Sequence, residues 1–159
     1  MDFKEIQSLP ITRIKVRALV KCGNNYVFIQ RRKYGKSKSY LVFAGGKVKK
    51  SDRIKGDKDN LGATLKSALV RELEEELAAK DIIIGDFLGY SKPRKHYKEV
   101  LFSVEVGSID WENRTGKEFT NPNKGDYDLV LIKDLSKDLL GKKGYHLKPR
   151  EWRKLLYRM

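Results

Sequence analysis

The chain has 159 residues, enough for one domain that buries a core between a sheet and helices. Its 35 lysines and arginines outnumber its 21 acids, and the formal net charge of +14 favours phosphate-bearing partners. The charge does not separate a nucleotide substrate from a nucleic acid, and a solvated basic surface is the alternative. Because Cys22 is the only cysteine, an intramolecular disulfide is excluded.

The chain shows no membrane or export signal. No apolar stretch approaches the length that crosses a bilayer. The first ten residues, MDFKEIQSLP, lack the apolar segment of a secretion signal. We therefore expect a cytoplasmic protein without membrane contact. The sequence leaves its oligomeric state open.

The first third of the chain reads as strands and turns. Ile14–Cys22 and Tyr26–Gln30 are apolar runs around a Gly/Asn turn, which predicts a hairpin. A shorter apolar run, Tyr40–Ala44, ends at a predicted glycine turn, Gly45-Gly46. Residues 49–60 are mostly charged and predict a solvated loop.

A helical period follows this loop. We predict a helix over Thr64–Ala79, with Thr64 as its N-cap. The apolar residues that recur at three- and four-residue steps are Leu65, Ala68, Leu69, Leu73 and Leu77. This spacing predicts one buried stripe along the helix.

The remaining chain alternates strands with one long loop. Residues 82–90 and 97–106 read as strands, and residues 111–126 as a polar loop. Tyr127–Ile132 reads as a further strand, and Pro149–Arg158 as a closing helix. Strands outnumber helices and mostly run in hairpin order. We therefore expect an α/β fold, a mixed and largely antiparallel sheet flanked by helices, in one domain over residues 1–159.

The predicted helix carries a cluster of glutamates. Glu72, Glu75 and Glu76 recur at helical spacing, so their carboxylates can converge, while Glu74 points away. A solvated acidic face explains Glu74 well. It explains Glu76 poorly, because Glu76 falls within the apolar stripe. A carboxylate placed toward a core must be paired, protonated or bound to metal. The cluster therefore favours a Mg²⁺ or Mn²⁺ site.

These residues resemble a known motif. The Nudix box is written G-x5-E-x7-R-E-U-x-E-E-x-G-U, where U is a bulky aliphatic residue. Gly46 matches its first position, and residues 71–76, RELEEE, match its R-E-U-x-E-E core. Gly45-Gly46-Lys47-Val48 resembles the glycine pair that precedes the box in many members. The order of predicted elements also resembles that of Nudix proteins, which implies an α/β/α sandwich.

The resemblance has three departures. Arg71 follows Gly46 by 25 positions, where the box has 14, so this segment is 11 residues longer. The first box glutamate therefore corresponds to Asp52 when counted from Gly46, and to Ala63 when counted from Arg71. Asp52 is a candidate metal ligand, with an ordinary loop aspartate as the alternative. Ala78 stands where the box has its last glycine, and Lys49 replaces a frequent acid.

The resemblance implies roles for these residues. Glu72, Glu75 and Glu76 would hold the metal, and Arg71 would orient the carboxylates. The base would lie on the 111–126 loop, with Glu118 as first candidate and Glu112 as second; an ordinary loop acid is the alternative. The candidate substrate contacts are Arg31, Arg32, Gly45, Gly46, Lys47 and Arg94, because cations can hold phosphates and arginine can do so with two bonds. For each cation, an ordinary surface charge is the alternative.

The implied activity is metal-dependent hydrolysis of the diphosphate linkage in a nucleoside diphosphate derivative. Glu75 would be central to it, with Glu118 and Arg71 assisting. The alternative is a catalytically reduced Nudix domain that binds RNA or a nucleotide. The basic charge favours that alternative, whereas the complete glutamate set favours the enzyme.

Overall fold

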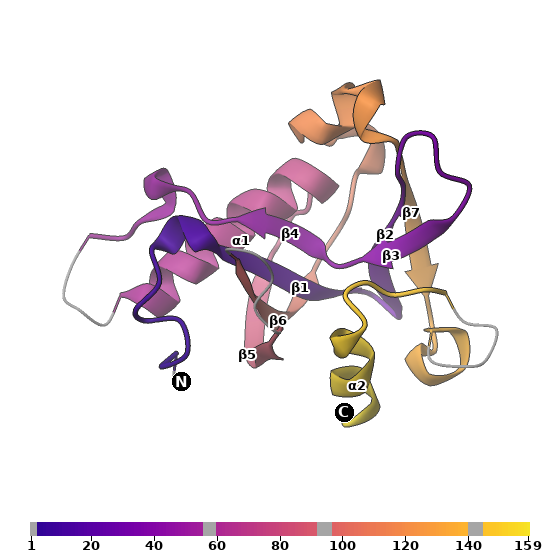
Figure 1. Ribbon diagram of the computed structural model, residues 1–159. Coiled ribbons are helices and arrows are strands. Elements are labelled where there is room, and N and C mark those ends of the chain that lie inside the picture. The colour runs from indigo at the N-terminus through magenta and orange to yellow at the C-terminus, as the bar shows by residue number, and fades with distance from the viewer. Residues whose placement is uncertain (1–2, 56–59, 92–96, 140–144) are drawn as a thin grey trace.

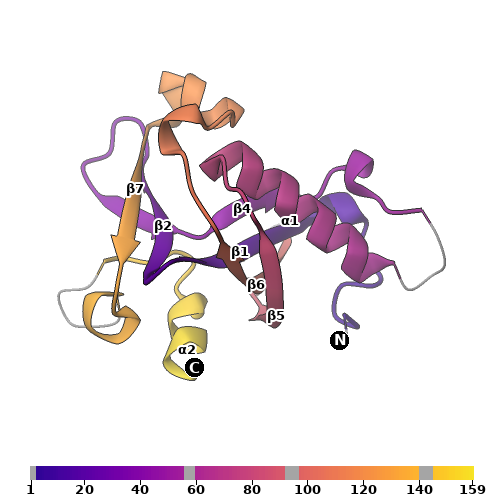
Figure 2. The ribbon, with the colours of Figure 1, turned by 180° about the vertical axis from the view of Figure 1, so that it is seen from behind.

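The computed structural model shows one seven-stranded mixed sheet with helices on both faces (Figure 1, and from behind in Figure 2). The structure describes residues 3–55, 60–91, 97–139 and 145–159. The α/β/α arrangement expected from the sequence is confirmed. None of the described helices is long and apolar enough to cross a membrane.

The sheet has three antiparallel pairs of strands that are consecutive in the sequence, and one pairing is parallel. The strands are β1 (Ile14–Cys22), β2 (Asn25–Arg32), β3 (Ser39–Val42), β4 (Ala44–Lys47), β5 (Ile83–Tyr90), β6 (Lys98–Val106) and β7 (Asp126–Ile132). The sheet order is β3-β2-β1-β6-β5, with β4 also paired to β1 and β7 also paired to β2. Only the pairing of β1 with β6 is parallel among the described strands. The predicted hairpin is confirmed, since Cys22 pairs with Asn25.

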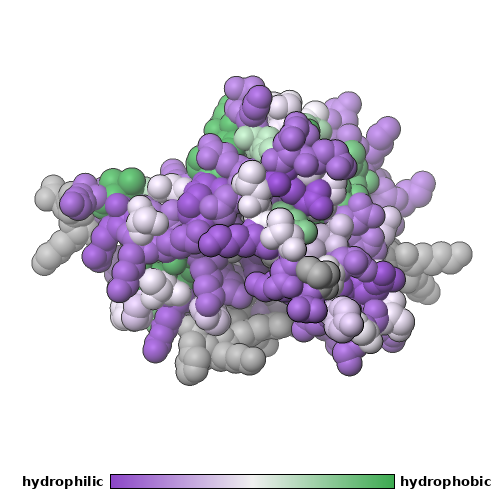
Figure 3. Space-filling view, turned by 90° about the horizontal axis from the view of Figure 1, so that it is seen from above, coloured by the Kyte–Doolittle hydropathy of each residue, from purple (hydrophilic) through white to green (hydrophobic). Residues whose placement is uncertain are grey.

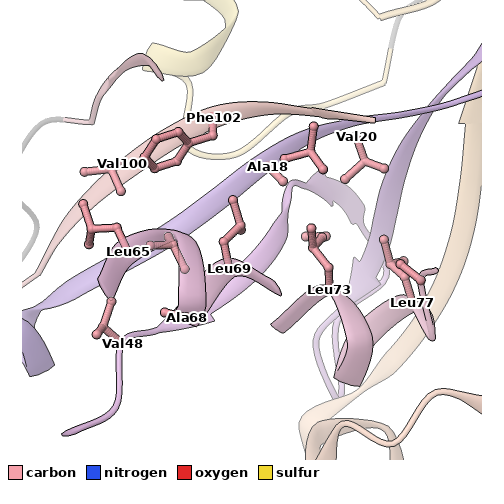
Figure 4. Close-up of a cluster of buried hydrophobic side chains, with 14 of the residues drawn as sticks. Ala18, Val20, Val48, Leu65, Ala68, Leu69, Leu73, Leu77, Val100 and Phe102 are labelled. Atoms are coloured by element: carbon pink, nitrogen blue, oxygen red, sulfur yellow. The ribbon is translucent and has the colours of Figure 1, made fainter. Parts of the chain in front are cut away.

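The two faces of the sheet bury separate cores. On one face, helix α1 (Leu61–Leu77) packs its leucine stripe against β1 and β6 (Figure 4). On the other face, helix α2 (Glu151–Tyr157) buries Trp152 against Phe43, with the ring centroids 6.0 Å apart. Trp152 is 1% exposed, as expected of a core residue. Seen from above Figure 1, the surface is mainly hydrophilic, with small separate apolar patches (Figure 3).

The start of α1 differs from the prediction. The helix begins at Leu61, so Thr64 lies inside its first turn and is not the N-cap. The Thr64 hydroxyl instead accepts a hydrogen bond from the backbone N–H of Ile54, at 3.1 Å. The sequence pattern alone could not place this start, because the hydroxyl is used by the preceding loop.

The glycine segment also differs from the prediction. Gly45 and Gly46 are not a turn but the centre of β4, where they pair with Arg17 and Val16 of β1. The apolar run from Tyr40 therefore divides at Phe43 into β3 and β4. The long loop after β6 is likewise not irregular throughout, because it contains short 3₁₀ helices, among them Trp111–Asn113 and Lys117–Thr120.

The end of α1 carries a backbone conformation that favours glycine. Ala78 has a φ of 44° and donates its N–H to the carbonyl of Glu74 at 3.0 Å. The next residue, Ala79, donates to the carbonyl of Leu73 at 3.4 Å. These bonds form the common left-handed helix end, in which the residue at positive φ is usually glycine. Ala78, which replaces the last glycine of the box, is therefore expected to make this helix end less stable than glycine would.

Replacing Ala78 by Gly is expected to raise the free energy of unfolding by about 1 kcal/mol, because the left-handed conformation is strained for a residue with a Cβ. Urea denaturation of both proteins measures this difference. The matched control is Ala79→Gly, since Ala79 is 6% exposed and has an ordinary φ. That change should lower stability. A lower stability for Ala78→Gly would contradict the prediction.

Candidate active site

Helix α1 places two carboxylates in a buried position. Glu72 and Glu76 are 8% and 9% exposed, whereas Glu74 lies on the exposed face, as the helical projection predicted. The side chain of Glu75 is 34% exposed. The apolar stripe buries this side of α1 against the sheet, so Glu72 and Glu76 are held at the edge of the core. Buried carboxylates must be satisfied by donors or cations.

Strand β4 meets these carboxylates with its two glycines. The N–H of Gly45 donates to Oε2 of Glu76 at 2.7 Å. A Cβ added to Gly46 would lie 2.7 Å from Oε1 of Glu72. The missing side chain of Gly46 therefore makes room for Glu72, whereas Gly45 contacts Glu76 through a main-chain N–H.

Arg71 joins the carboxylates of this site. Its Nη1 donates to Oε1 of Glu72 at 2.9 Å and to Oε2 of Glu75 at 3.2 Å. Its Nε and Nη2 donate to the two oxygens of Asp52, at 2.8 and 2.9 Å. Nη2 also donates to the carbonyl of Lys47 at 3.0 Å. The planar guanidinium thus fixes the relative positions of α1, β4 and the loop between them.

Asp52 is not a solvated loop residue, because it is 5% exposed. Burial by itself raises the pKa of this carboxyl, but the hydrogen bonds from Arg71 and from the N–H of Lys49 outweigh burial and leave the pKa below its usual value. The hydrogen bonds to Asp52 raise the pKa of Arg71, and the neighbouring Glu72 raises it further. Of the two residues that could replace the first box acid, Asp52 joins the site, and Ala63 is exposed on α1.

The loop after β6 docks on the same turn of α1. The carbonyl of Glu75 accepts hydrogen bonds from the N–H groups of Thr115 and Gly116, at 2.8 and 2.9 Å. Glu118 follows on the 3₁₀ helix Lys117–Thr120, and its side chain lies outside the part that the structure describes. Glu112 is exposed. The loop that carries the predicted base is therefore attached beside the glutamates.

Trp111 lies at the start of this loop and has ring neighbours. The guanidinium of Arg114 lies 4.0 Å from its ring centroid, and Phe119 packs against it edge-on with the centroids 5.4 Å apart. These contacts hold the 111–120 segment together.

A basic pocket lies on the sheet face opposite α1. It encloses about 480 Å³, and its charged lining residues are Lys15, Arg17, Arg31, Lys33, Glu99 and Lys148. Arg17 is bound to Oε1 of Glu99 at 3.0 Å. Arg17 also donates to the carbonyl of Gly45 at 2.9 Å. Gly45 therefore contacts the glutamate site through its N–H and the basic pocket through its carbonyl.

The predicted phosphate-binding residues do not all lie at the basic pocket. Arg31 lines the basic pocket, and Lys47 lies beside it, with its ammonium 4.3 Å from the ring centroid of Tyr97. Arg32 is exposed and forms an ion pair with Asp126. Arg94 lies outside the described residues.

Sequence reasoning missed most of the basic pocket. Lys15 and Arg17 alternate with the buried Val16 and Ala18 on β1, and this alternation indicates that both cations share the face opposite the α1 core. Burial lowers the pKa of Lys15, and the neighbouring Arg17 lowers it further. Glu99 and Lys148 carried no local signal, because only tertiary structure brings them to this face.

Comparison with known proteins agrees with this architecture. No family model and no curated protein matches the sequence. Among solved structures, a Nudix hydrolase from Nitrosomonas europaea matches with a TM-score of 0.61 at 13% identity, covering 91% of this chain and 86% of that one. This chain has the Nudix fold. The MutT protein of Methanosarcina mazei Go1 matches with a TM-score of 0.55 at 17% identity, covering 95% and 94%. A Bacillus subtilis pyrophosphohydrolase matches with a TM-score of 0.56 at 16% identity, covering 99% and 85%.

The Nudix box residues offer suitable donors for a divalent cation. The carboxylate oxygens of Glu72, Glu75 and Glu76 are the hard ligands that Mg²⁺ and Mn²⁺ prefer. In the part of the chain that the structure describes, no three Asp, Glu, His or Cys side chains already form a metal-binding group. Arg71 lies among the acids instead, and Lys49 approaches Oε1 of Glu75 at 3.9 Å. The donor type fits, and a cation at Glu75 would compete with these two side chains.

Proposed function

We propose that this protein hydrolyses the diphosphate linkage of a nucleoside diphosphate derivative with the help of Mg²⁺ or Mn²⁺. The observation that carries the proposal is the position of Glu72 and Glu76. Both carboxylates are buried on α1 and face the glycine strand, where the N–H of Gly45 meets Glu76. An acidic helix face that serves only solubility has no reason to bury two glutamates.

In this proposal, Glu72, Glu75 and Glu76 hold the cation. When bound, the cation neutralises phosphate charge and makes a nearby water more acidic. Glu75 supports this proposal because its side chain is more exposed than those of Glu72 and Glu76. Its ion pairs are with Arg71 and Lys49. Glu118 takes up the water's proton, and its loop is attached to the Glu75 turn through Thr115 and Gly116.

Asp52 and Arg71 are positioning residues in this proposal. Both oxygens of Asp52 accept hydrogen bonds from Arg71, and Oδ2 accepts a further one from Lys49. This arrangement supports a role for Asp52 in orienting Arg71, in place of the metal-ligand role considered from the sequence. Arg71 in turn orients Glu72 and Glu75.

A non-enzymatic module that binds RNA or a nucleotide is the second candidate. The feature that favours it is the basic pocket together with the +14 charge, since neither feature requires catalysis. A binding module of this kind does not explain why Glu72 and Glu76 are buried beside the glycine strand. For this reason we favour the hydrolase.

Product release from a panel of diphosphate compounds tests the hydrolase. The panel holds a dinucleoside polyphosphate, a nucleotide sugar, ADP-ribose, a nucleoside triphosphate and a 5′-triphosphorylated RNA. Each compound is assayed with Mg²⁺, with Mn²⁺ and with EDTA. We expect metal-dependent cleavage of at least one compound. A folded protein that binds RNA in a salt-dependent way and cleaves nothing in the panel would support the binding module instead.

A further inference from the structure

The basic pocket carries more positive charge than a two-phosphate substrate needs. Its charged lining comprises five cations and the single carboxylate of Glu99. A diphosphate joined to other groups at both ends carries about two negative charges, whereas a terminal triphosphate carries about four near neutral pH. The net charge of the lining therefore matches the longer phosphate chain.

Three of the five cations of the pocket are held by neighbouring groups. The ammonium of Lys148 lies 4.4 Å from the ring centroid of Tyr40, and that of Lys15 lies 4.7 Å from the ring centroid of Tyr97. Arg17 is fixed by the carbonyls of Phe43 and Gly45, at 3.3 and 2.9 Å. Aromatic rings hold Lys15 and Lys148 over the site without neutralising them, whereas Arg17 is also ion-paired with Glu99. These contacts distinguish the pocket from a surface of freely moving lysines.

Two residues of the lining carry a buried donor without a hydrogen-bond partner. The indole Nε1 of Trp152 and the Nε of Arg31 are buried and have no hydrogen-bond partner among the described residues. Trp152 is 1% exposed and lines the pocket. A buried donor without an acceptor is costly and needs an explanation. Any acceptor oxygen, a phosphate oxygen among them, would satisfy such a donor.

The pocket and the glutamate site share one residue of β4. The N–H of Gly45 faces Glu76, and its carbonyl accepts from Arg17 of the pocket. Strand β4 is therefore in contact with both places, through Glu76 on the α1 side and through Arg17 on the pocket side.

We propose that the basic pocket selects substrates with three or more consecutive phosphates on a nucleoside, in preference to two-phosphate diesters. This inference rests on the proposed hydrolase for its catalytic outcome, but not for binding. A free nucleoside triphosphate and an RNA 5′-triphosphate end share this chemistry, and the experiment separates them.

The experiment compares kcat/KM for a nucleoside triphosphate, a short 5′-triphosphorylated RNA and ADP-ribose in Mg²⁺. The test variant is Lys33→Gln with Lys148→Gln, because both lysines line the pocket and are exposed, so their loss should not unfold the protein. The matched control is Lys66→Gln with Lys124→Gln, which removes two exposed lysines that do not line the pocket.

We expect the wild type to prefer the triphosphates, and the pocket variant to lose about tenfold or more on them but less than about threefold on ADP-ribose. The control should match the wild type. A larger effect for RNA than for the free nucleotide would identify the RNA end as the source. An equal loss on all substrates, or a wild type that prefers ADP-ribose, would overturn the proposal.

A binding measurement separates failure of the pocket from failure of the hydrolase. A non-hydrolysable triphosphate analogue is titrated by calorimetry into the wild type and both double variants. If nothing is cleaved but the analogue binds and the pocket variant weakens it about tenfold, the pocket proposal stands and the hydrolase fails. If ADP-ribose is cleaved and the analogue binds all three proteins equally, the hydrolase stands and the pocket proposal fails.

Discussion

Glu75→Gln is expected to lower metal-dependent turnover by about 100-fold or more, with little change in stability. Glutamine keeps the length of the side chain but removes the negative charge that would hold a cation. Arg71 would still bind Asp52 and Glu72, so the frame of the site should persist. Initial rates over a range of Mg²⁺ and Mn²⁺ concentrations measure the loss for the best substrate of the panel.

The neighbouring glutamate supplies the control for this experiment. Glu74 is on the same turn of α1 but lies on the exposed face. Glu74→Gln changes the net charge by the same amount and should keep wild-type turnover. Similar losses in both variants would indicate a general charge effect, and an active Glu75→Gln would remove Glu75 from the mechanism.

Gly45→Ala should have the largest effect on stability, a loss of about 3 kcal/mol or more in the free energy of unfolding. Gly45 has a φ of 135°, where residues with a Cβ are strained. The added Cβ would also lie 2.0 Å from the carbonyl oxygen of Val16 on β1, so β4 must shift. Urea denaturation measures the loss, and circular dichroism shows whether the variant folds.

Gly35→Ala separates the two contributions. Gly35 also has a positive φ, 71°, but a Cβ there would meet no atom within 4 Å. It should cost only about 1 kcal/mol, because the conformational strain acts without a clash. A Gly45→Ala protein that loses no more stability than Gly35→Ala would show that β4 adapts to a side chain.

The sequence predicted best what depends on local periodicity. The leucine spacing predicted α1 and the burial of Glu76, and the Gly/Asn turn predicted the first hairpin. Predictions that depend on neighbours in space were less accurate. Thr64 has the chemistry of an N-cap, but its hydroxyl binds Ile54. Gly45 and Gly46 have the composition of a turn, but they pair with Arg17 and Val16 of β1 as a strand.

The candidate site shows the same division. The box helix could be predicted because its residues are contiguous. Asp52 could not be chosen over Ala63, because the 11 extra residues gave two alignments and only the contact with Arg71 separates them. The basic pocket was missed because its lining comes from distant segments, including Arg17 and Glu99, which the parallel pairing of β1 and β6 brings together.

The contacts made by β4 have a consequence for how this chain can diverge. Arg17 binds the carbonyls of Phe43 and Gly45, Arg71 binds the carbonyl of Lys47, and Glu76 binds an N–H. All four are main-chain groups, which every residue supplies and which substitutions on β4 leave in place. Only the glycines are constrained, by the absence of a side chain. Such a strand can keep these four contacts while its side chains change.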